Sequence, residues 1–493
     1  MLDIVNKGAL LYIGGEWVSG SGGTEAVINP ANERVIGQAP LGSAADAEAA
    51  IAAAREAFDT GLWPRLPARE RQAKMTAFLA AIERRKEEII ALTVAEAGAP
   101  QVLARFLHYE TPMKHARATV ELATRDPVTA HAPEVTPQAD GTKTLGMALM
   151  VRQPIGVVGA ITAYNFPFFL NLAKVIPSLA VGCTVVLKPS PYTPFAALLF
   201  GEIAEEVGLP PGVLNIVNGG AEVGERLTTD ARVDLVTFTG SDVVGAKIQA
   251  QAAPTLKRVI MELGGKSALI VRPDADLRAA VACGLVNFTT QCGQGCGLLT
   301  RHIVHNSIRA QYVEALAAIA RQVKVGDPAD PATGMGPLIR EAARTRTEQL
   351  VASAQDEGAR LVAGGKRPSD LDKGFYFEPT LFDDVKNHFR IARQEVFGPV
   401  GVVIGYDDDD EAIGIANDSD YGLGGGVFSA DAGKAYEMAL RLHTGNVSIN
   451  GGAGAMSSQA PFGGVRRSGY GLEYGLQGLN EFTYAKTVSF HGG

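Results

Sequence analysis

Cysteine is scarce in this sequence, which has four in 493 residues: Cys183, Cys283, Cys292 and Cys296. So few cysteines do not build a disulfide framework, and in a reducing compartment a thiol is more often buried, catalytic or metal-bound. Apolar runs of about 18 residues, long enough to span a bilayer, are also missing. The opening "MLDIVNKGALLYIGGEW" lacks the basic start and apolar core of a signal peptide. We therefore expect a cytoplasmic protein without a membrane partner.

Clusters of basic residues are missing too. The chain has 45 Lys and Arg against 53 Asp and Glu, which gives a formal net charge of −8 at pH 7. Without a block of consecutive Lys or Arg to follow a phosphate backbone, nucleic acid is not an expected partner. What the sequence does have is length and apolar residues, at 46%. At roughly 150 residues per domain, we expect about three structural units.

The first part of the chain is predicted to be mainly helical. Residues 44–60 and 68–98 have helix-forming composition with apolar positions three and four apart, and a short β-like start precedes them. From 124 to 153 the composition changes to Pro, Thr and Val around an Asp-Gly turn, which predicts a long β-hairpin. Because a two-stranded ribbon is marginal alone, we expect this arm to dock on a partner subunit. The strand-like tail "GLNEFTYAKTVSF" is expected to pair with it.

A regular alternation of apolar strands and helices begins near residue 155 and predicts a parallel sheet. The helices are expected around 168–181, 193–207, 221–229 and 242–252. Parallel sheets bind ligands at the carboxyl ends of their strands, and these ends carry Asn165, Lys188, Gly219, Gly240 and Glu262. The G-x-G-x-x-G fingerprint is absent, and the turn "FTGSDVVG" is weak evidence for a dinucleotide by itself. A second α/β pattern from 262 to about 450, with helices near 274–290, 307–322 and 339–357, predicts another domain.

The stretch "NFTTQCGQGCGLLTR" (287–301) holds Cys292 and Cys296, four residues apart. Followed by His302 and His305, they superficially resemble a zinc site. The histidines stand three apart on an expected strand and so face opposite sides, which disfavours a metal. A buried structural thiol is a second interpretation. A reactive thiol is the third, favoured by glycines that let backbone N–H groups approach a reacting atom: Gly293, Gly295 and Gly297.

A series of short motifs decides between these interpretations. They are, in chain order, "YNFP", "KPSPYTP", "FTGS", "MELGGKS", "GQGC", "EVFGPV" and "PFGGVRRSGYG". Their order and spacing closely resemble the NAD(P)-dependent aldehyde dehydrogenase superfamily over essentially the whole chain. The resemblance implies two Rossmann-like parallel α/β domains, one for the cofactor and one catalytic, plus a β-hairpin oligomerisation arm. We expect the NAD(P)-binding domain at 1–123 and 154–261, the catalytic domain at 262–450, and the arm at 124–153 and 475–493.

Catalytic roles follow from the same resemblance. Cys296 matches the nucleophile, and Asn165 with the Cys296 backbone N–H matches the site that holds the oxyanion of the thiohemiacetal. Glu262 matches the general base that activates water against the thioester, so oxidation to a free carboxylate is expected. Lys174 and Glu473 match positions linked to proton handling or to support of the site. A reversible Cys292–Cys296 disulfide is a further hypothesis, with packing as the first role of Cys292.

The resemblance also implies cofactor contacts, among them Lys188 to the adenosine ribose, Glu395 to the nicotinamide ribose and Phe397 beside the nicotinamide. Pro191 stands where many NAD-preferring members have Glu, which removes a ribose acceptor and also its repulsion of a 2′-phosphate. NAD is the first choice and NADP the alternative. The full expected set is Thr162, Tyr164, Lys188, Ser190, Gly220, Gly224, Thr239, Gly240, Ser241, Leu263, Glu395 and Phe397.

The expected aldehyde channel is neutral. It comprises Phe166, Phe169, Leu170, Ala173, Gly295, Gly297, Ala455 and Met456. The channel has no Arg or Lys to bind a distal carboxylate and no aromatic box to bind a quaternary ammonium group. Its lining therefore predicts aromatic or medium-chain aldehydes as substrates. The alternatives are a semialdehyde-specific dehydrogenase, ester hydrolysis by the same thiol, and a catalytically silent binding or structural protein. A homodimer or homotetramer is expected.

Overall fold

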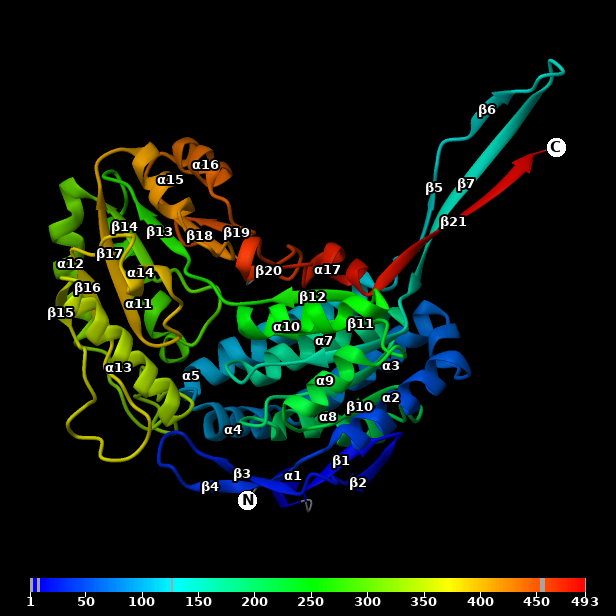
Figure 1. Cartoon of the computed structure of the whole chain (residues 1–493), viewed down its shortest axis with the longest axis horizontal. Coiled ribbons are helices and arrows are strands. Elements are labelled where there is room, and N and C mark those ends of the chain that lie inside the picture. The colour runs from blue at the N-terminus through cyan, green and yellow to red at the C-terminus, as the bar shows by residue number, and fades with distance from the viewer. Residues whose placement is uncertain (1–2, 7–8, 126, 453–456, 493) are drawn as a thin grey trace.

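Two mainly parallel sheets with antiparallel edge strands, each covered by helices, and a long antiparallel arm form the molecule (Figure 1). This computed structural model describes residues 3–6, 9–125, 127–452 and 457–492. The first sheet has the strand order β2-β1-β10-β9-β8-β11-β12-β20. Its strands are β1 (Leu10–Ile13), β2 (Glu16–Ser19), β8 (Val157–Ile161), β9 (Thr184–Lys188), β10 (Leu214–Ile216), β11 (Leu235–Thr239), β12 (Arg258–Glu262) and β20 (Gly469–Tyr470).

The central strands of this sheet are parallel and buried on both faces, as near-continuous apolar strands predict. Alternate residues serve two cores: Val185 and Leu187 pack in one, Val186 in the other. Around the sheet lie α7 (Pro167–Val181), α8 (Phe195–Glu206), α9 (Ala221–Thr229), α10 (Asp242–Ala252) and η3 (Ala253–Thr255). The four helices expected here are confirmed to within two residues at each end.

The N-terminal region contains more strand than expected. Besides β1 and β2, a ribbon of β3 (Thr24–Ile28) and β4 (Val35–Pro40) lies between the first two helices of the chain. The helices are α1 (Asp3–Asn6), α2 (Ala44–Asp59), η1 (Trp63–Arg65), α3 (Ala68–Arg84), α4 (Lys86–Ala97), α5 (Gln101–Leu103), η2 (Ala104–Glu110) and α6 (Thr111–Leu122). η2 is a π-helix, a rare form often found at functional sites.

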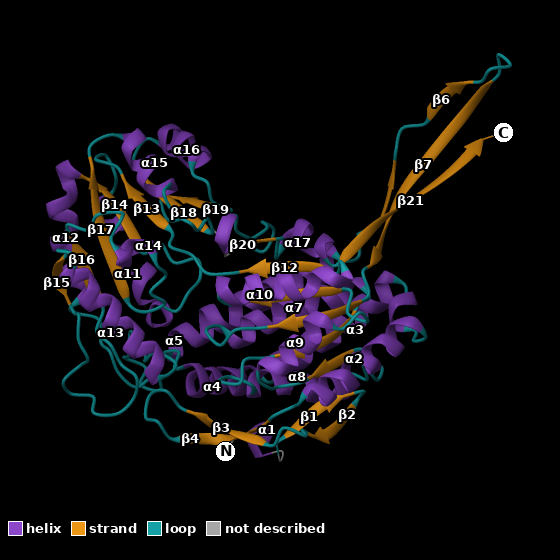
Figure 2. Ribbon diagram, viewed as in Figure 1, coloured by secondary structure: helices purple, strands orange, loops and turns teal. Residues whose placement is uncertain are grey.

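The second sheet has the order β15-β16-β17-β14-β13-β18-β19. Its strands are β13 (Ala268–Val271), β14 (Arg301–His305), β15 (Arg360–Ala363), β16 (Thr380–Asp383), β17 (Val400–Tyr406), β18 (Gly424–Phe428) and β19 (Asn446–Ile449). Helices surround it as they surround the first sheet (Figure 2). They are α11 (Leu277–Thr289), η4 (Thr290–Gly293), α12 (Asn306–Ala320), α13 (Glu341–Asp356), α14 (Arg390–Arg393), α15 (Asp409–Asn417), α16 (Ala432–Arg441) and η6 (Arg466–Ser468).

The arm projects from the body at one end of the molecule (Figure 1). β7 (Lys143–Pro154) pairs with β5 (Val128–Ala130) and β6 (Glu134–Pro137) on one side and with the C-terminal β21 (Thr483–Gly492) on the other. The expected pairing of tail and arm is confirmed. The tail is not strand throughout, however, because residues 475–481 form helix α17 (Gly475–Glu481).

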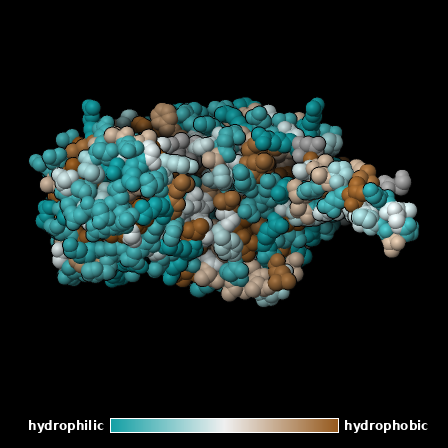
Figure 3. All heavy atoms as spheres, turned by 90° about the horizontal axis from the view of Figure 1, so that it is seen from above, coloured by the Kyte–Doolittle hydropathy of each residue, from teal (hydrophilic) through white to brown (hydrophobic). Residues whose placement is uncertain are grey.

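Apolar side chains are exposed along the arm (Figure 3). They include Val135, Leu145, Met147, Val488 and Phe490, which are 39–60% exposed. Such a group on a thin ribbon marks an interaction surface. Among the described residues no helix combines the length and apolar character needed to cross a membrane.

Helix α8 begins without a side-chain cap of its own. The Glu96 carboxylate, fully buried on α4, replaces it: one oxygen accepts from Phe195 N at 2.8 Å and the other from Ala196 N at 3.4 Å. Glu96→Ala leaves these N–H groups without an acceptor, so we expect the free energy of unfolding to fall by about 1–3 kcal/mol, measured by urea denaturation. Unchanged stability would contradict this role.

Glu96→Gln is the matched control, because it keeps one acceptor. Burial raises the pKa of Glu96 to about 8, so the folded state holds a proton that the unfolded chain releases near pH 4.5. Its contribution to stability is therefore complete below that pH and is lost as pH rises through about 8. The glutamine variant should lose this part of the pH dependence and less stability than the alanine variant.

Candidate active site

A cavity of about 630 Å³ opens at the carboxyl ends of β8, β9, β11 and β12. The second domain closes it from the opposite side with residues such as Arg340, Arg346 and Phe397. Cys296 and Glu262 both line it. The cavity is thus placed where open parallel sheets bind their ligands.

The expected cofactor residues converge on this cavity. Those that line it are Thr162, Tyr164, Lys188, Ser190, Gly220, Gly224, Thr239, Gly240, Ser241, Glu395 and Phe397. Leu263 is not among the lining residues: its side chain packs in the core beneath the cavity, and its N–H donates to the Ser468 carbonyl at 3.1 Å. Sequence reasoning missed four lining residues outside the quoted motifs: Lys247 and Gln251 on α10, Arg346 on α13, and Arg340 immediately before α13.

Burial controls the charges in the cavity. It lowers the pKa of Lys188 to about 8. It raises the pKa of Glu395 to about 7, although Glu395 accepts a hydrogen bond from Gly265 N at 3.0 Å. Both groups can therefore change charge near neutral pH when a ligand alters their surroundings.

Cys296 and Glu262 are adjacent. The pKa of the Glu262 carboxyl is raised to about 8, first by burial and then by the charge of Glu473, against the lowering effects of the Cys296 thiol and of Lys174. Burial, followed by the Glu262 charge, raises the pKa of Cys296 well above its usual value. Neither Glu262 oxygen receives a hydrogen bond from a nitrogen or oxygen atom of the described residues. The thiol is protonated in this state, and the Glu262 carboxyl lies beside it.

A buried ion pair lies behind Glu262. Lys174 on α7 donates to Glu473 Oε1 at 2.7 Å and to Thr237 Oγ1 at 3.1 Å, and both charged side chains are nearly inaccessible. Opposite charges at this separation offset much of the cost of their desolvation. The charges of the pair also affect the pKa of Glu262, which Glu473 raises and Lys174 lowers.

Asn165 is 3% exposed and directs its amide toward the nucleophile loop. Its Nδ2 donates to the Gln294 carbonyl at 2.8 Å. An amide nitrogen carries two hydrogens, so one donor remains for a ligand. The structure thus brings the predicted oxyanion donor to the loop that carries Cys296.

Aromatic rings form the wall beside Cys296. Tyr474 interacts electrostatically with the thiol, and its ring lies 5.9 Å from Phe169 and 6.4 Å from Phe462. A Cβ added to Gly297 would come within 3.6 Å of Phe462. Phe462 and Tyr474 were not among the predicted channel residues, although "PFGGVRRSGYG" contains the first.

The remaining channel residues are not all at this wall. Ala173 and Phe169 line a small hollow of about 10 Å³ with Tyr474. Leu170 is buried in α7, and the space at Gly295 is filled by Leu298. Phe166 packs against His108, with ring centroids 4.6 Å apart and a tilt of 33°. Ala455 and Met456 lie outside the described residues.

The second cysteine of the loop is structural. Cys292 is 1% exposed and packs in a core of the second domain, as its predicted packing role requires. The two histidines considered as metal ligands make other hydrogen bonds. The His302 ring bonds with the Tyr312 hydroxyl, and the His305 ring bonds with the Ser307 hydroxyl and the Asp407 carbonyl. Within the described ranges no group of three or more His, Cys, Asp or Glu could hold a metal ion.

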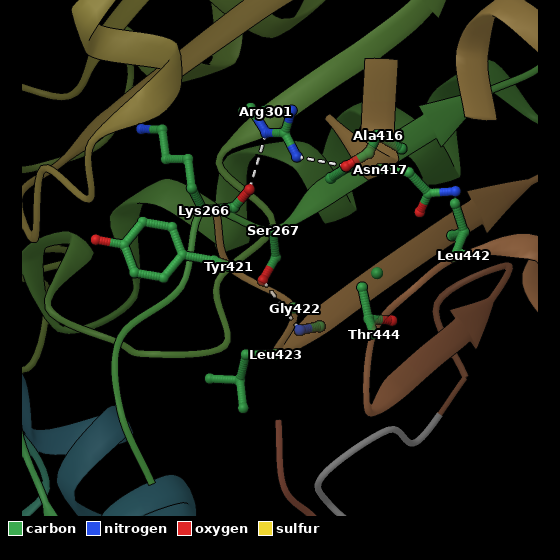
Figure 4. A pocket seen from close by; sticks show the side chains of 13 residues that line it. Lys266, Ser267, Arg301, Ala416, Asn417, Tyr421, Gly422, Leu423, Leu442 and Thr444 are labelled. Atoms are coloured by element: carbon green, nitrogen blue, oxygen red, sulfur yellow. Dashed lines mark hydrogen bonds between the residues drawn. The ribbon is translucent and has the colours of Figure 1, made fainter. Parts of the chain in front are cut away.

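Another small hollow, of about 10 Å³, lies beside β14 (Figure 4). Arg301, 2% exposed, donates there to the carbonyls of Lys266 and Ala416 at 2.8 Å. Figure 4 shows the Lys266 ammonium pointing away from the other lining side chains. The hollow is a packing gap between β13, β14, β18 and α15. It is too small to hold a substrate.

A cavity at the ends of a parallel sheet, with a thiol beside a buried carboxylate, defines a nucleotide-binding α/β enzyme that uses covalent catalysis. The model of the aldehyde dehydrogenase family matches residues 17–488. The chain therefore belongs to the aldehyde dehydrogenase family, a class of NAD(P)-dependent enzymes.

Individual relatives cover nearly the whole chain. A 3-succinoylsemialdehyde-pyridine dehydrogenase from a Pseudomonas species is 41% identical over 98% of both chains. An aldehyde dehydrogenase from Mycobacterium tuberculosis, solved with NAD+, has a TM-score of 0.91 and 41% identity over 97% of both chains. A variant of aldehyde dehydrogenase C from Pseudomonas syringae, solved with NAD+ and octanal, has a TM-score of 0.92 and 39% identity, covering 98% of this chain and 97% of its own.

The Lys174–Glu473 pair allows a test of its energetic role. Lys174→Met leaves the Glu473 charge buried without its cation, so we expect a loss of about 3–5 kcal/mol in unfolding free energy. The double variant Lys174→Met/Glu473→Gln should recover most of it, because no unpaired charge remains. Urea denaturation of the variants and of Glu473→Gln completes the cycle. A double variant no more stable than Lys174→Met would refute the argument.

Proposed function

We propose that this enzyme oxidises an apolar aldehyde, aromatic or medium-chain aliphatic, to its carboxylate with NAD as the coenzyme. The observation that carries the proposal is the convergence of Cys296, Glu262 and Asn165 on one cavity. A thiol, a base and an amide donor are the groups needed to form and hydrolyse a thioester. Intact groups of this kind also argue against a catalytically silent protein.

The cavity residues fit a dinucleotide. Ser241 caps α10, whose N-terminus is a suitable site for a pyrophosphate. The buried Thr239 hydroxyl has no partner among the described residues, and a Cβ at Gly220 would meet nothing within 4 Å. Lys188 and Glu395 would hold the two riboses, and NADP is the alternative because Pro191 brings no carboxylate. Bound nicotinamide would supply the acceptor for the hydride that leaves the substrate carbon.

The protein first has to ionise its nucleophile. Cys296 is protonated and adjacent to Glu262, so the fraction of Glu262 that is ionised can take the thiol proton as sulfur attacks the aldehyde carbon, and then release it to solvent. The developing oxyanion is held by Asn165 Nδ2 and the Cys296 backbone N–H. Removing one such donor typically costs about 2.7–4 kcal/mol of transition-state stabilisation.

Hydrolysis of the thioester uses the same carboxylate again. Once Glu262 has released the thiol proton to solvent, its carboxylate, which has no nitrogen or oxygen partner among the described residues, can accept a proton from water as that water attacks the carbonyl carbon. Cys296 leaves as the thiolate and the product leaves as the carboxylate. The Lys174–Glu473 pair behind Glu262 adjusts its pKa and supports its position.

The substrate class rests on the neutral wall of Phe169, Phe462 and Tyr474. Its rings bury apolar surface and offer no cation to a distal carboxylate. The names of two relatives support this choice: one acts on an aldehyde that carries a pyridine ring, and the other was solved with octanal. A semialdehyde with a terminal carboxylate is the alternative.

The assembly belongs to the same proposal. The exposed apolar residues of the arm would be covered in a homodimer or homotetramer. We assign residues 1–123 and 154–261 to cofactor binding, 262–450 to catalysis, and 124–153 with β21 to the arm. The four cysteines are free, in keeping with a reducing, cytoplasmic location.

Absorbance of the reduced nicotinamide, followed with octanal, benzaldehyde and succinic semialdehyde and with NAD and NADP in parallel, tests the function. We expect oxidation of the first two, with at least tenfold lower kcat/KM on the third. Cys296→Ser should abolish it with every aldehyde. Full activity of that variant would refute covalent catalysis, and equal efficiency on all three aldehydes would refute the substrate class.

The pH dependence of hydrolysis follows from Glu262. Its raised pKa means that the carboxyl is protonated below about pH 8 and cannot accept a proton there. We expect kcat to rise with pH through about 8 where thioester hydrolysis limits the rate. Glu262→Gln should lower kcat by about 10²- to 10⁴-fold and remove this inflection. A glutamine variant with the wild-type profile would assign the inflection to another group.

A further inference from the structure

The turn that precedes the nucleophile is left-handed. Gln291, Cys292 and Gly293 have φ values of 50°, 54° and 73°. This conformation is unfavourable for residues with a Cβ, and only glycine adopts it readily. Gly293 is enclosed, since an added Cβ would lie 2.0 Å from the Gly398 carbonyl oxygen. Surrounding contacts must therefore hold the turn in place.

The Gln291 side chain makes two of these contacts, and both reach the N-terminal helices. Its Nε2 donates to the carbonyl of Ala97, at the end of α4, at 2.7 Å. Its Oε1 lies 3.1 Å from His108 Nε2 on the π-helix η2. The amide nitrogen is already the donor to Ala97, so the histidine donates and carries its proton on Nε2. Gln291 is 2% exposed and His108 fully buried, so water does not replace these bonds.

The turn is connected to the reacting groups through Gln294. The backbone N–H and the side-chain Nε2 of Gln294 both donate to the Gln291 carbonyl, each at 3.0 Å. Its own carbonyl accepts the hydrogen bond from Asn165 Nδ2. The His108 ring also packs, tilted by 33°, against Phe166, which is next to Asn165 in the chain. A displacement of Gln291 would therefore move both the Cys296 backbone and the Asn165 amide.

We propose that Gln291 is a positioning residue: anchored by His108 and by the Ala97 carbonyl, it holds the left-handed turn that places Cys296 opposite the Asn165 amide. Gln291 does not line the cavity. The inference rests on the proposed function for its catalytic readout, whereas placement of the thiol can be measured without turnover.

Gln291→Met tests the proposal, because it keeps the length of the side chain and removes both hydrogen bonds. We expect kcat on octanal to fall roughly 10- to 100-fold, the effect of a misplaced reacting group, with KM changed less than threefold. Alkylation of Cys296 by iodoacetamide in the free enzyme should become at least threefold faster, because the loosened turn exposes the thiol. Values of kcat and alkylation rate within twofold of wild type would overturn the proposal.

Gln291→Glu supplies the conservative variant. Its buried carboxyl has a raised pKa, and in the protonated form it can donate to Ala97 and accept from His108 as glutamine does. We expect kcat near wild type at low pH and a growing deficit relative to wild type as pH rises. A constant deficit at all pH values would overturn the proposal. This variant also keeps the test decisive if the methionine variant fails to fold.

Asn215→Leu is the matched control. Asn215 is a fully buried amide on β10 that donates to the carbonyls of Val185 and Gly212, and it does not line the cavity. It reports what the loss of buried amide hydrogen bonds alone does to activity. A fall in kcat equal to that of Gln291→Met would assign the effect to stability and overturn the proposal. If wild type oxidises no aldehyde, the proposed function fails, while the alkylation rates still decide whether Gln291 places the thiol.

Discussion

The burial of Cys296 against Glu262 is the interaction on which the rest of this structure depends. Burial raises the pKa of both groups, and the Glu262 charge raises that of Cys296 further, so the free enzyme keeps a protonated thiol and a carboxyl whose pKa lies near 8. This arrangement suits a reaction in which one proton leaves the thiol and another leaves water. It requires that both groups be held in a cavity whose walls come from different sheets.

Holding buried charges in that cavity has a structural cost, and neighbouring elements offset it. Lys174 and Glu473, far apart in the chain, form an ion pair directly behind the base. The strand β20 and the bridge between Phe462 and Glu473 bring the C-terminal segment back to the edge of the first sheet. That return places Glu473 and Tyr474 beside residues of α7. The catalytic thiol and its support are therefore assembled from segments that the fold, not the sequence order, brings together.

Much of the fold could be read from periodicity. Helices α9 and α10 were predicted at their observed bounds, because helix-forming residues and glycine turns punctuate the chain there. The short strands β4, β15 and β16 were missed, because strands of four to six residues are too short to show a clear alternation. The tail was expected to be strand from residue 478, but its first part forms α17 against α6 and α7. Tertiary packing decided that segment.

The sequence by itself determined the chemistry: the motifs name a thiol, a carboxylate, an amide and a set of cavity residues, and they predict the family to which the chain belongs. Only the tertiary structure decided how these groups are placed and charged. Cys292 packs in a core of the second domain, whereas Cys296 faces the cavity. Phe462 and Tyr474 join the wall beside the thiol. Gln291 contacts α4 and η2, which are distant in the sequence. The physical reason is that burial and through-space contacts set pKa values, rotamers and backbone strain, and neighbours in space are not encoded by spacing along the chain.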